Sequence, residues 1–185
     1  MRHSRRDFVM TGAAGAAVLA SPALARVKLR IVATTGMIAD AARRVGGEFV
    51  QVKGLMGSGV DPHSYRQTRS DIVAMTRADL VLWHGLYLEA QMEEFLHKLG
   101  KRVAVKAVTD TIPREALRVH PTYDDKFDPH VWMAPNVWTY CIAEIRDVMS
   151  QARPDLAEAF AANAQTYLQE LNELHEFTKK TTATV

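Results

Sequence analysis

Short strand-like runs alternate with helix-like runs between residues 29 and 108, and this order restricts the fold more than any other feature of the chain. Runs of β-branched and other apolar residues, bounded by glycine or polar residues, occur at 29–34, 49–53, 80–83 and 102–108. Helical patterns separate them, at about 37–45, 70–77 and 89–99, with Ser70 as a predicted N-cap. Such an order predicts parallel strands joined by right-handed crossovers. We therefore predict an α/β fold: a four-stranded parallel sheet with helices on both faces.

Two further helices are predicted in the C-terminal part of the chain. The first covers about 136–151, and the second begins near Pro154 and ends near Lys179. Apolar side chains follow one another in the second helix at steps of three and four residues, as in an amphipathic helix. They are Leu156, Phe160, Ala164, Tyr167, Leu168, Leu171 and Leu174. At 1.5 Å per residue this helix would be about 40 Å long, so we expect it to brace more than this one domain. Residues 181–185 are rich in threonine and valine and read as strand-prone.

The N-terminal segment has the pattern of an export signal. Residues 4–9 contain a twin-arginine motif, residues 11–20 are small and apolar, and Ala23-Leu24-Ala25 provides a cleavage site. The apolar run is too short to span a bilayer. We predict a twin-arginine signal peptide over residues 1–25 and a periplasmic protein; the alternative interpretation is a basic tail.

Without this segment the chain has no excess of basic charge. Removing residues 1–25 lowers Lys+Arg from 23 to 20 and Asp+Glu from 21 to 20, because Arg2, Arg5, Arg6 and Asp7 leave with it. We therefore predict neither a nucleic acid nor direct membrane insertion as a mode of binding. Cys141 is the one cysteine, which excludes an intramolecular disulfide and indicates a buried, inert thiol.

The tripeptide Asp-Pro-His occurs twice, at Asp61-Pro62-His63 and Asp128-Pro129-His130. Proline fixes its own φ and favours extended geometry in the residue before it, so each histidine follows a stiff segment. Both tripeptides follow predicted strands, and ligands of open parallel sheets bind at the carboxyl ends of strands. Neutral imidazoles are ligands of zinc, manganese, iron, nickel and copper. We predict that His63 and His130 bind a divalent transition metal.

Four other residues are candidates for a further ligand or for a partner that orients an imidazole. His84 ends the third predicted strand, and His120 lies in the long irregular segment 109–127. For Asp61 and Asp128, capping of their own turns is favoured over contact with an imidazole. His97 and His175 lie among charged residues on helices and are interpreted as solvated.

An enzyme remains an alternative at this point. Two histidines, a third ligand and an activated water would make a metallohydrolase. However, no H-E-x-x-H motif, serine elbow or general base next to either histidine is present. The glycine-rich segment 54–59 does not match a phosphate-binding loop and reads as a flexible approach to His63.

Four stretches carry a resemblance to a known family: IVATTGMIAD at 31–40, GVDPHSY at 59–65, GLYLE at 85–89 and DPHVWM at 128–133. In order and spacing, from about residue 28 to 180, the chain resembles the metal-binding receptors of bacterial ABC importers for zinc and manganese, the cluster A-I solute-binding proteins. The resemblance implies high-affinity capture of manganese or zinc in the periplasm and delivery to the membrane subunit of an ABC permease, without enzymatic activity.

The resemblance also implies two α/β lobes joined by one long helix, with the metal between them. His63 and His130 then correspond to the first-lobe ligands, residues 26–152 to the first lobe, and residues 153–180 to the connecting helix. The second lobe, which supplies the other ligands, is expected to be absent from this sequence, as in a truncated receptor or a nonfunctional remnant of one. His84 departs from the family, where asparagine is common. With His120 as its one histidine, the segment 109–127 favours manganese slightly over zinc.

Overall fold

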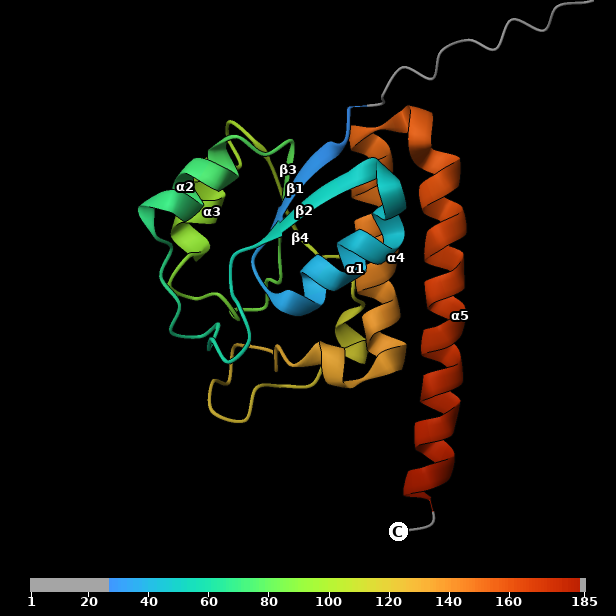
Figure 1. Cartoon of the computed structure of the whole chain (residues 1–185). Helices are drawn as coiled ribbons and strands as arrows, with labels where there is room; N and C mark the ends of the chain where they lie inside the picture. The colour runs from blue at the N-terminus through green and yellow to red at the C-terminus, as the bar shows by residue number, and fades with distance from the viewer. Residues whose placement is uncertain (1–26, 184–185) are drawn as a thin grey trace, which may run out of the picture.

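Four parallel strands form the centre of the structure, a computed structural model that describes residues 27–183 (Figure 1). The strands are β1 (Leu29–Ala33), β2 (Val50–Gly54), β3 (Leu80–Trp83) and β4 (Ala104–Ala107). Their order across the sheet is β2-β1-β3-β4, and all three neighbouring pairs are parallel. The predicted four-stranded parallel sheet is thus confirmed. The signal peptide predicted over residues 1–25 lies outside the described residues.

Helices cover both faces of this sheet, as predicted. The α-helices are α1 (Gly36–Gly46), α2 (Arg69–Thr76), α3 (Glu93–Leu99), α4 (Pro135–Ala152) and α5 (Ala157–Thr182). Short 3-10 turns lie at Gly47–Phe49, Arg114–Ala116, Val131–Met133 and Pro154–Leu156. Figure 1 shows α2 and α3 on one side of the sheet and α1 and α4 on the other, with α5 outside α4. Within residues 27–183, no helix is both long and apolar enough to cross a bilayer.

The core is divided by the sheet into two apolar clusters. Ile31 and Leu82 point to the cluster shared with α1, α4 and α5, whereas Val32 and Val81 point to the cluster shared with α2 and α3. This alternation follows from the two-residue period of a strand. Because both faces are buried, the strands read as continuous apolar runs. Cys141 lies in the first cluster, where burial raises the pKa of its thiol far above the usual range.

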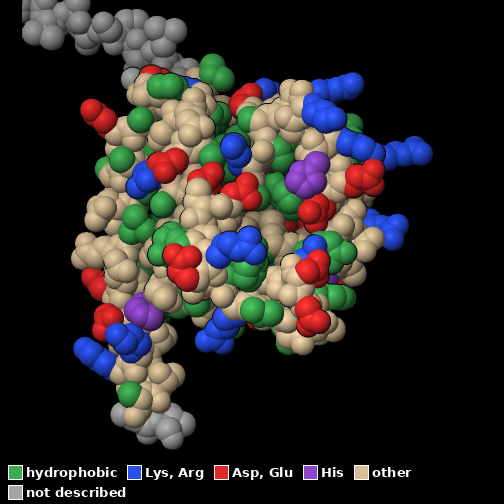
Figure 2. All heavy atoms as spheres, turned by 180° about the vertical axis from the view of Figure 1, so that it is seen from behind, with side chains coloured by type: hydrophobic (Ala, Val, Ile, Leu, Met, Phe, Trp, Pro, Cys, Tyr) green, Lys and Arg blue, Asp and Glu red, His purple; other side chains and the backbone are tan. Residues whose placement is uncertain are grey.

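The long helix α5 packs against α1 and α4 through its first half. Phe160, Ala164, Tyr167 and Leu171 are buried at steps of three and four residues. Beyond them, Leu174 and Phe177 are exposed to 47% and 65%. Figures 1 and 2 show that this C-terminal part of α5 extends past the body of the protein.

Three element boundaries differ from the sequence prediction. Helix α2 is capped by Thr68 rather than Ser70, because the Thr68 hydroxyl and the Asp71 carboxylate each accept a hydrogen bond from the other's backbone amide. Helix α3 begins at Glu93, four residues later than predicted. The expectation of a strand-prone segment at 181–185 is wrong for Thr181 and Thr182, which continue α5.

Packing of α5 is tested by Phe160→Ala. The Phe160 side chain is fully buried, so its removal should lower the free energy of unfolding by about 3–5 kcal/mol. Phe177→Ala is the matched control on the same helix and should change it by less than about 0.5 kcal/mol. Urea unfolding followed by circular dichroism measures both values. Equal effects of the two substitutions would contradict the packing of α5 described above.

Candidate metal centre

The two predicted metal ligands and the candidate His84 each follow the carboxyl end of a strand of the sheet. His63 lies in the segment after β2, His84 directly follows β3, and His130 lies at the end of the long segment after β4. Because the strands are parallel, these segments leave the sheet at the same edge. Backbone hydrogen bonds join the strand ends there, for example from Met56 N to Thr34 O at 3.0 Å.

The first Asp-Pro-His tripeptide forms a turn that its own aspartate caps. Asp61 Oδ1 accepts a hydrogen bond from the His63 amide at 3.0 Å, and Oδ2 accepts one from the Ser64 hydroxyl at 2.9 Å. These hydrogen bonds hold the pKa of Asp61 below its usual value. The carboxylate thus stabilises the turn from which the His63 ring extends.

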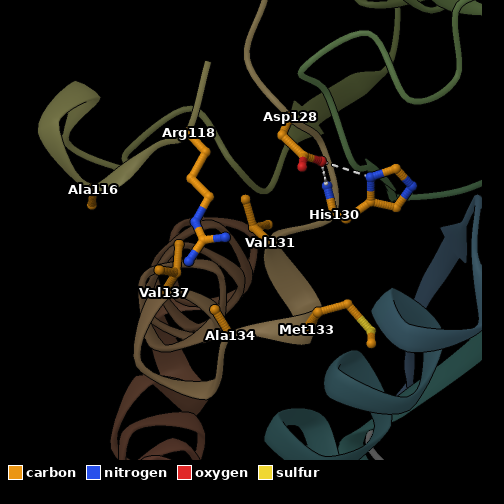
Figure 3. Close-up of a pocket in the computed structure, with 8 residues that line it drawn as sticks. All are labelled: Ala116, Arg118, Asp128, His130, Val131, Met133, Ala134 and Val137. Atoms are coloured by element: carbon orange, nitrogen blue, oxygen red, sulfur yellow. Dashed lines mark hydrogen bonds and ion pairs between the residues drawn. The ribbon is translucent and has the colours of Figure 1, made fainter. Parts of the chain in front are cut away.

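In the second tripeptide the aspartate contacts both the backbone and the ring of the histidine. Asp128 Oδ1 accepts from the His130 amide at 3.0 Å and lies 2.6 Å from His130 Nδ1 (Figure 3). The backbone and ring hydrogen bonds lower the pKa of Asp128. A carboxylate acceptor requires the proton on Nδ1, which leaves the Nε2 lone pair of His130 available to a metal. The sequence treated turn capping and ring orientation as alternatives, but Asp128 does both.

The structure brings the two tripeptide histidines together. The ring centroids of His63 and His130 are 5.5 Å apart and the rings are tilted by 49°. His63 lines a hollow of about 200 Å³ with Tyr87 and His120. His130 lines a second hollow, of about 230 Å³. Figure 3 shows that the His130 ring points away from Val137, which lines the same hollow. Among residues 27–183, no group of three or more His, Cys, Asp or Glu side chains is arranged to hold a metal ion.

His84 lies in the interior of the protein, against the chain segment that leads into His130. It is fully buried, and its Nε2 lies 2.6 Å from the carbonyl oxygen of Pro129, the residue before His130. Burial lowers the pKa of His84 to about 4. In this position His84 Nε2 contacts the backbone segment that carries His130.

His120 shares the hollow with His63, but its ring is engaged. Its Nδ1 accepts hydrogen bonds from the amides of Thr122 and Tyr123, at 3.0 and 3.2 Å. Since Nδ1 is the acceptor, the proton of the neutral ring must lie on Nε2. His120 therefore presents a donor to the hollow, not a lone pair.

The sequence prediction missed Glu89, a buried carboxyl group below the site. Its Oε1 accepts from the Thr34 hydroxyl at 2.6 Å and from the His84 amide at 2.8 Å, and Oε2 accepts from the Gly85 amide at 3.3 Å. Burial raises the pKa of Glu89 above its usual value, although these hydrogen bonds oppose the shift.

Glu89 supports a turn with unusual backbone geometry. Leu86 and Tyr87 have φ of 51° and 66°, a backbone conformation that residues other than glycine rarely adopt. The buried carboxyl group holds the start of this turn through the His84 and Gly85 amides. A lone acidic residue among the mostly apolar residues 86–92 was the available signal, but it also fitted the first turn of a helix.

Comparisons with known proteins identify the family of this chain. A family profile described as "Zinc-uptake complex component A periplasmic" (ZnuA) matches residues 31–185. The chain belongs to this family. The manganese-binding lipoprotein MntA of Bacillus subtilis is 42% identical over 83% of the chain and 50% of its own length. The iron-binding protein YfeA of Yersinia pestis is 33% identical over 80% of the chain and 47% of its own length.

A solved structure of the same family has the same fold. The periplasmic zinc-binding protein TroA of Treponema pallidum superposes with a TM-score of 0.81 at 35% identity, covering 85% of this chain and 56% of TroA. The chain thus spans about half the length of MntA, YfeA and TroA.

The role of Glu89 is tested by Glu89→Ala. This change leaves the Thr34 hydroxyl and the His84 and Gly85 amides without their acceptor, so the free energy of unfolding should fall by about 3 kcal/mol. Glu89→Gln keeps one acceptor oxygen and should cost about 1 kcal/mol. Urea unfolding measures both. If Glu89→Ala were no worse than Glu89→Gln, the carboxyl group would not support the turn.

Proposed function

We propose that this chain captures a divalent transition metal, manganese or zinc, in the periplasm for delivery to the membrane subunit of an ABC permease. The observation that carries the proposal is the meeting of His63 and His130, at 5.5 Å between ring centroids, on two turns of the same tripeptide. Membership of the ZnuA family supports it.

The chemistry of the pair suits a divalent transition metal. Neutral imidazole nitrogen binds such ions, and the Asp128 carboxylate selects the His130 tautomer whose Nε2 can ligate. Two nitrogens are half of a tetrahedral set. We propose that the remaining ligands come from outside residues 27–183, from a second lobe that faces this one.

We further propose a division of the chain into three parts. Residues 1–25 serve as a twin-arginine signal, residues 26–152 as the metal-binding lobe, and residues 153–180 as a helix that connects two lobes. The projection of α5 beyond Leu171, with Leu174 and Phe177 exposed, supports the connecting role. The word "periplasmic" in the family description supports export.

The metal itself is proposed from the relatives together with the ligand chemistry. Relatives are named for manganese, zinc and iron, and two imidazoles do not distinguish between these ions. We expect the two-histidine site alone to bind metal much more weakly than a site with four protein ligands.

No observation favours the hydrolase. The carboxylates nearest the two histidines, Asp61 and Asp128, accept hydrogen bonds within their own turns. Neither is therefore placed as the general base that hydrolysis would need. A nonfunctional remnant would bind no metal at all, so metal titration also separates that alternative from a working half-site.

The first test is removal of each ligand. Purified chain is titrated with Zn²⁺ and Mn²⁺ by calorimetry. Loss of a residue that only hydrogen-bonds to a ligand weakens metal binding by roughly 10–100-fold. Loss of a ligand itself should cost more, so we expect a larger effect from His63→Ala and from His130→Ala. His97→Ala is the control, because the exposed His97 ring contacts Glu93 and Trp83 instead. Binding unchanged in both site variants would disprove the proposal.

The second test compares the two aspartates. Asp128→Ala removes the acceptor that orients the His130 ring and should weaken Zn²⁺ binding by about 10–100-fold. Asp61→Ala is the matched change in the other tripeptide. It removes hydrogen bonds to the His63 amide and the Ser64 hydroxyl, with no bond to the His63 ring, so the loss should be smaller. A larger loss for Asp61→Ala would contradict the role given to Asp128.

A further inference from the structure

A buried histidine, His84, lies against the second tripeptide, where its Nε2 is 2.6 Å from the Pro129 carbonyl oxygen. The His84 ring is fully buried between two tryptophans. Its centroid is 5.3 Å from that of Trp132, edge to face, and 6.3 Å from that of Trp138, nearly parallel. The backbone of His84 is also held, since its amide donates to Glu89 and its carbonyl accepts from the Thr109 hydroxyl at 2.7 Å. Both the ring and the backbone of His84 are thus held by contacts.

The ring of His84 hydrogen-bonds to the chain segment that carries His130. The carbonyl oxygen of Pro129 can only accept, so the proton of the His84 ring lies on Nε2, 2.6 Å away. Nδ1 is then a buried acceptor, and it has no partner within residues 27–183. A buried acceptor without a donor is unfavourable for folding. An apolar side chain of similar volume would avoid this cost, so stability alone does not explain a histidine here.

The Pro129 carbonyl belongs to the peptide that leads into His130. It accepts from the Val131 amide at 2.8 Å as well as from His84. Asp128 holds the amide and Nδ1 of His130 from the other side. His84 and Asp128 together leave the backbone of His130 little freedom, and the direction of its Nε2 follows from that backbone.

We propose that His84 is a positioning residue of the metal site: its Nε2–H fixes the Pro129–His130 peptide and thereby aims His130 Nε2 at the metal shared with His63. This inference rests on the proposed function. It predicts that metal affinity depends on a donor at position 84, whereas the fold without metal does not.

The experiment separates the donor from the volume of the side chain. His84→Leu keeps a similar volume but removes the donor, and it should raise the Kd for Zn²⁺ by about 10–100-fold. The urea midpoint of the metal-free chain should not fall, since the unpaired Nδ1 is removed too. His84→Gln offers an amide donor at a similar reach and should stay within about threefold of the original Kd. His97→Leu, the same change at an exposed histidine, should leave both measurements unaltered.

Several outcomes would overturn the inference. Zn²⁺ binding by His84→Leu at the original affinity would show that the donor is not needed. A loss of affinity that only follows a lower urea midpoint would make His84 an ordinary core residue. If His84→Leu does not fold, His84→Gln decides: a Kd within threefold supports the donor, and a tenfold rise overturns it. Unchanged binding by His130→Ala would instead remove the proposed function itself.

Discussion

The parallel pairing of four strands that are buried on both faces is the constraint on which the rest of the structure depends. Since every strand runs in the same direction, each following segment leaves from one edge of the sheet. His63, separated from His130 by more than sixty residues of chain, meets it only because β2 and β4 end at that edge. The same pairing requires helices on both faces, and α4 and α5 then complete the cluster around Ile142 and Phe160.

A layer of buried polar groups lies between the sheet and the two histidines. Glu89 holds the amides of His84 and Gly85, and His84 holds the carbonyl of Pro129. Burying these two groups lowers the stability of the fold. Burial raises the pKa of Glu89, and His84 Nδ1 has no partner among the described residues. One unsatisfied buried group costs about 1–3 kcal/mol. These groups lower the stability of the fold while they fix the backbone next to the candidate site.

Much of the fold could be predicted because it depends on periodic patterns. The apolar runs that become β1 and β3 and the three- and four-residue steps of α5 each identify an element by its own period. Boundaries were harder where two local signals compete. Ser70 is a plausible cap, but the reciprocal hydrogen bonds of Thr68 and Asp71 start α2 earlier. Glu89 fits the first turn of a helix by sequence, but its side chain is buried and accepts a hydrogen bond from Thr34.

The sequence by itself determined the fold class and identified His63 and His130 as the candidate ligands, because a strand's period and a repeated tripeptide are local properties of the chain. Only the tertiary structure decided the roles of the other candidates. Which nitrogen of a neutral histidine is available to a metal depends on which one carries the proton, and the partner that decides this is set by folding. For His84 that partner is Pro129 O, 45 residues away. For His120 the partners are two nearby amides, which only a folded turn directs at Nδ1.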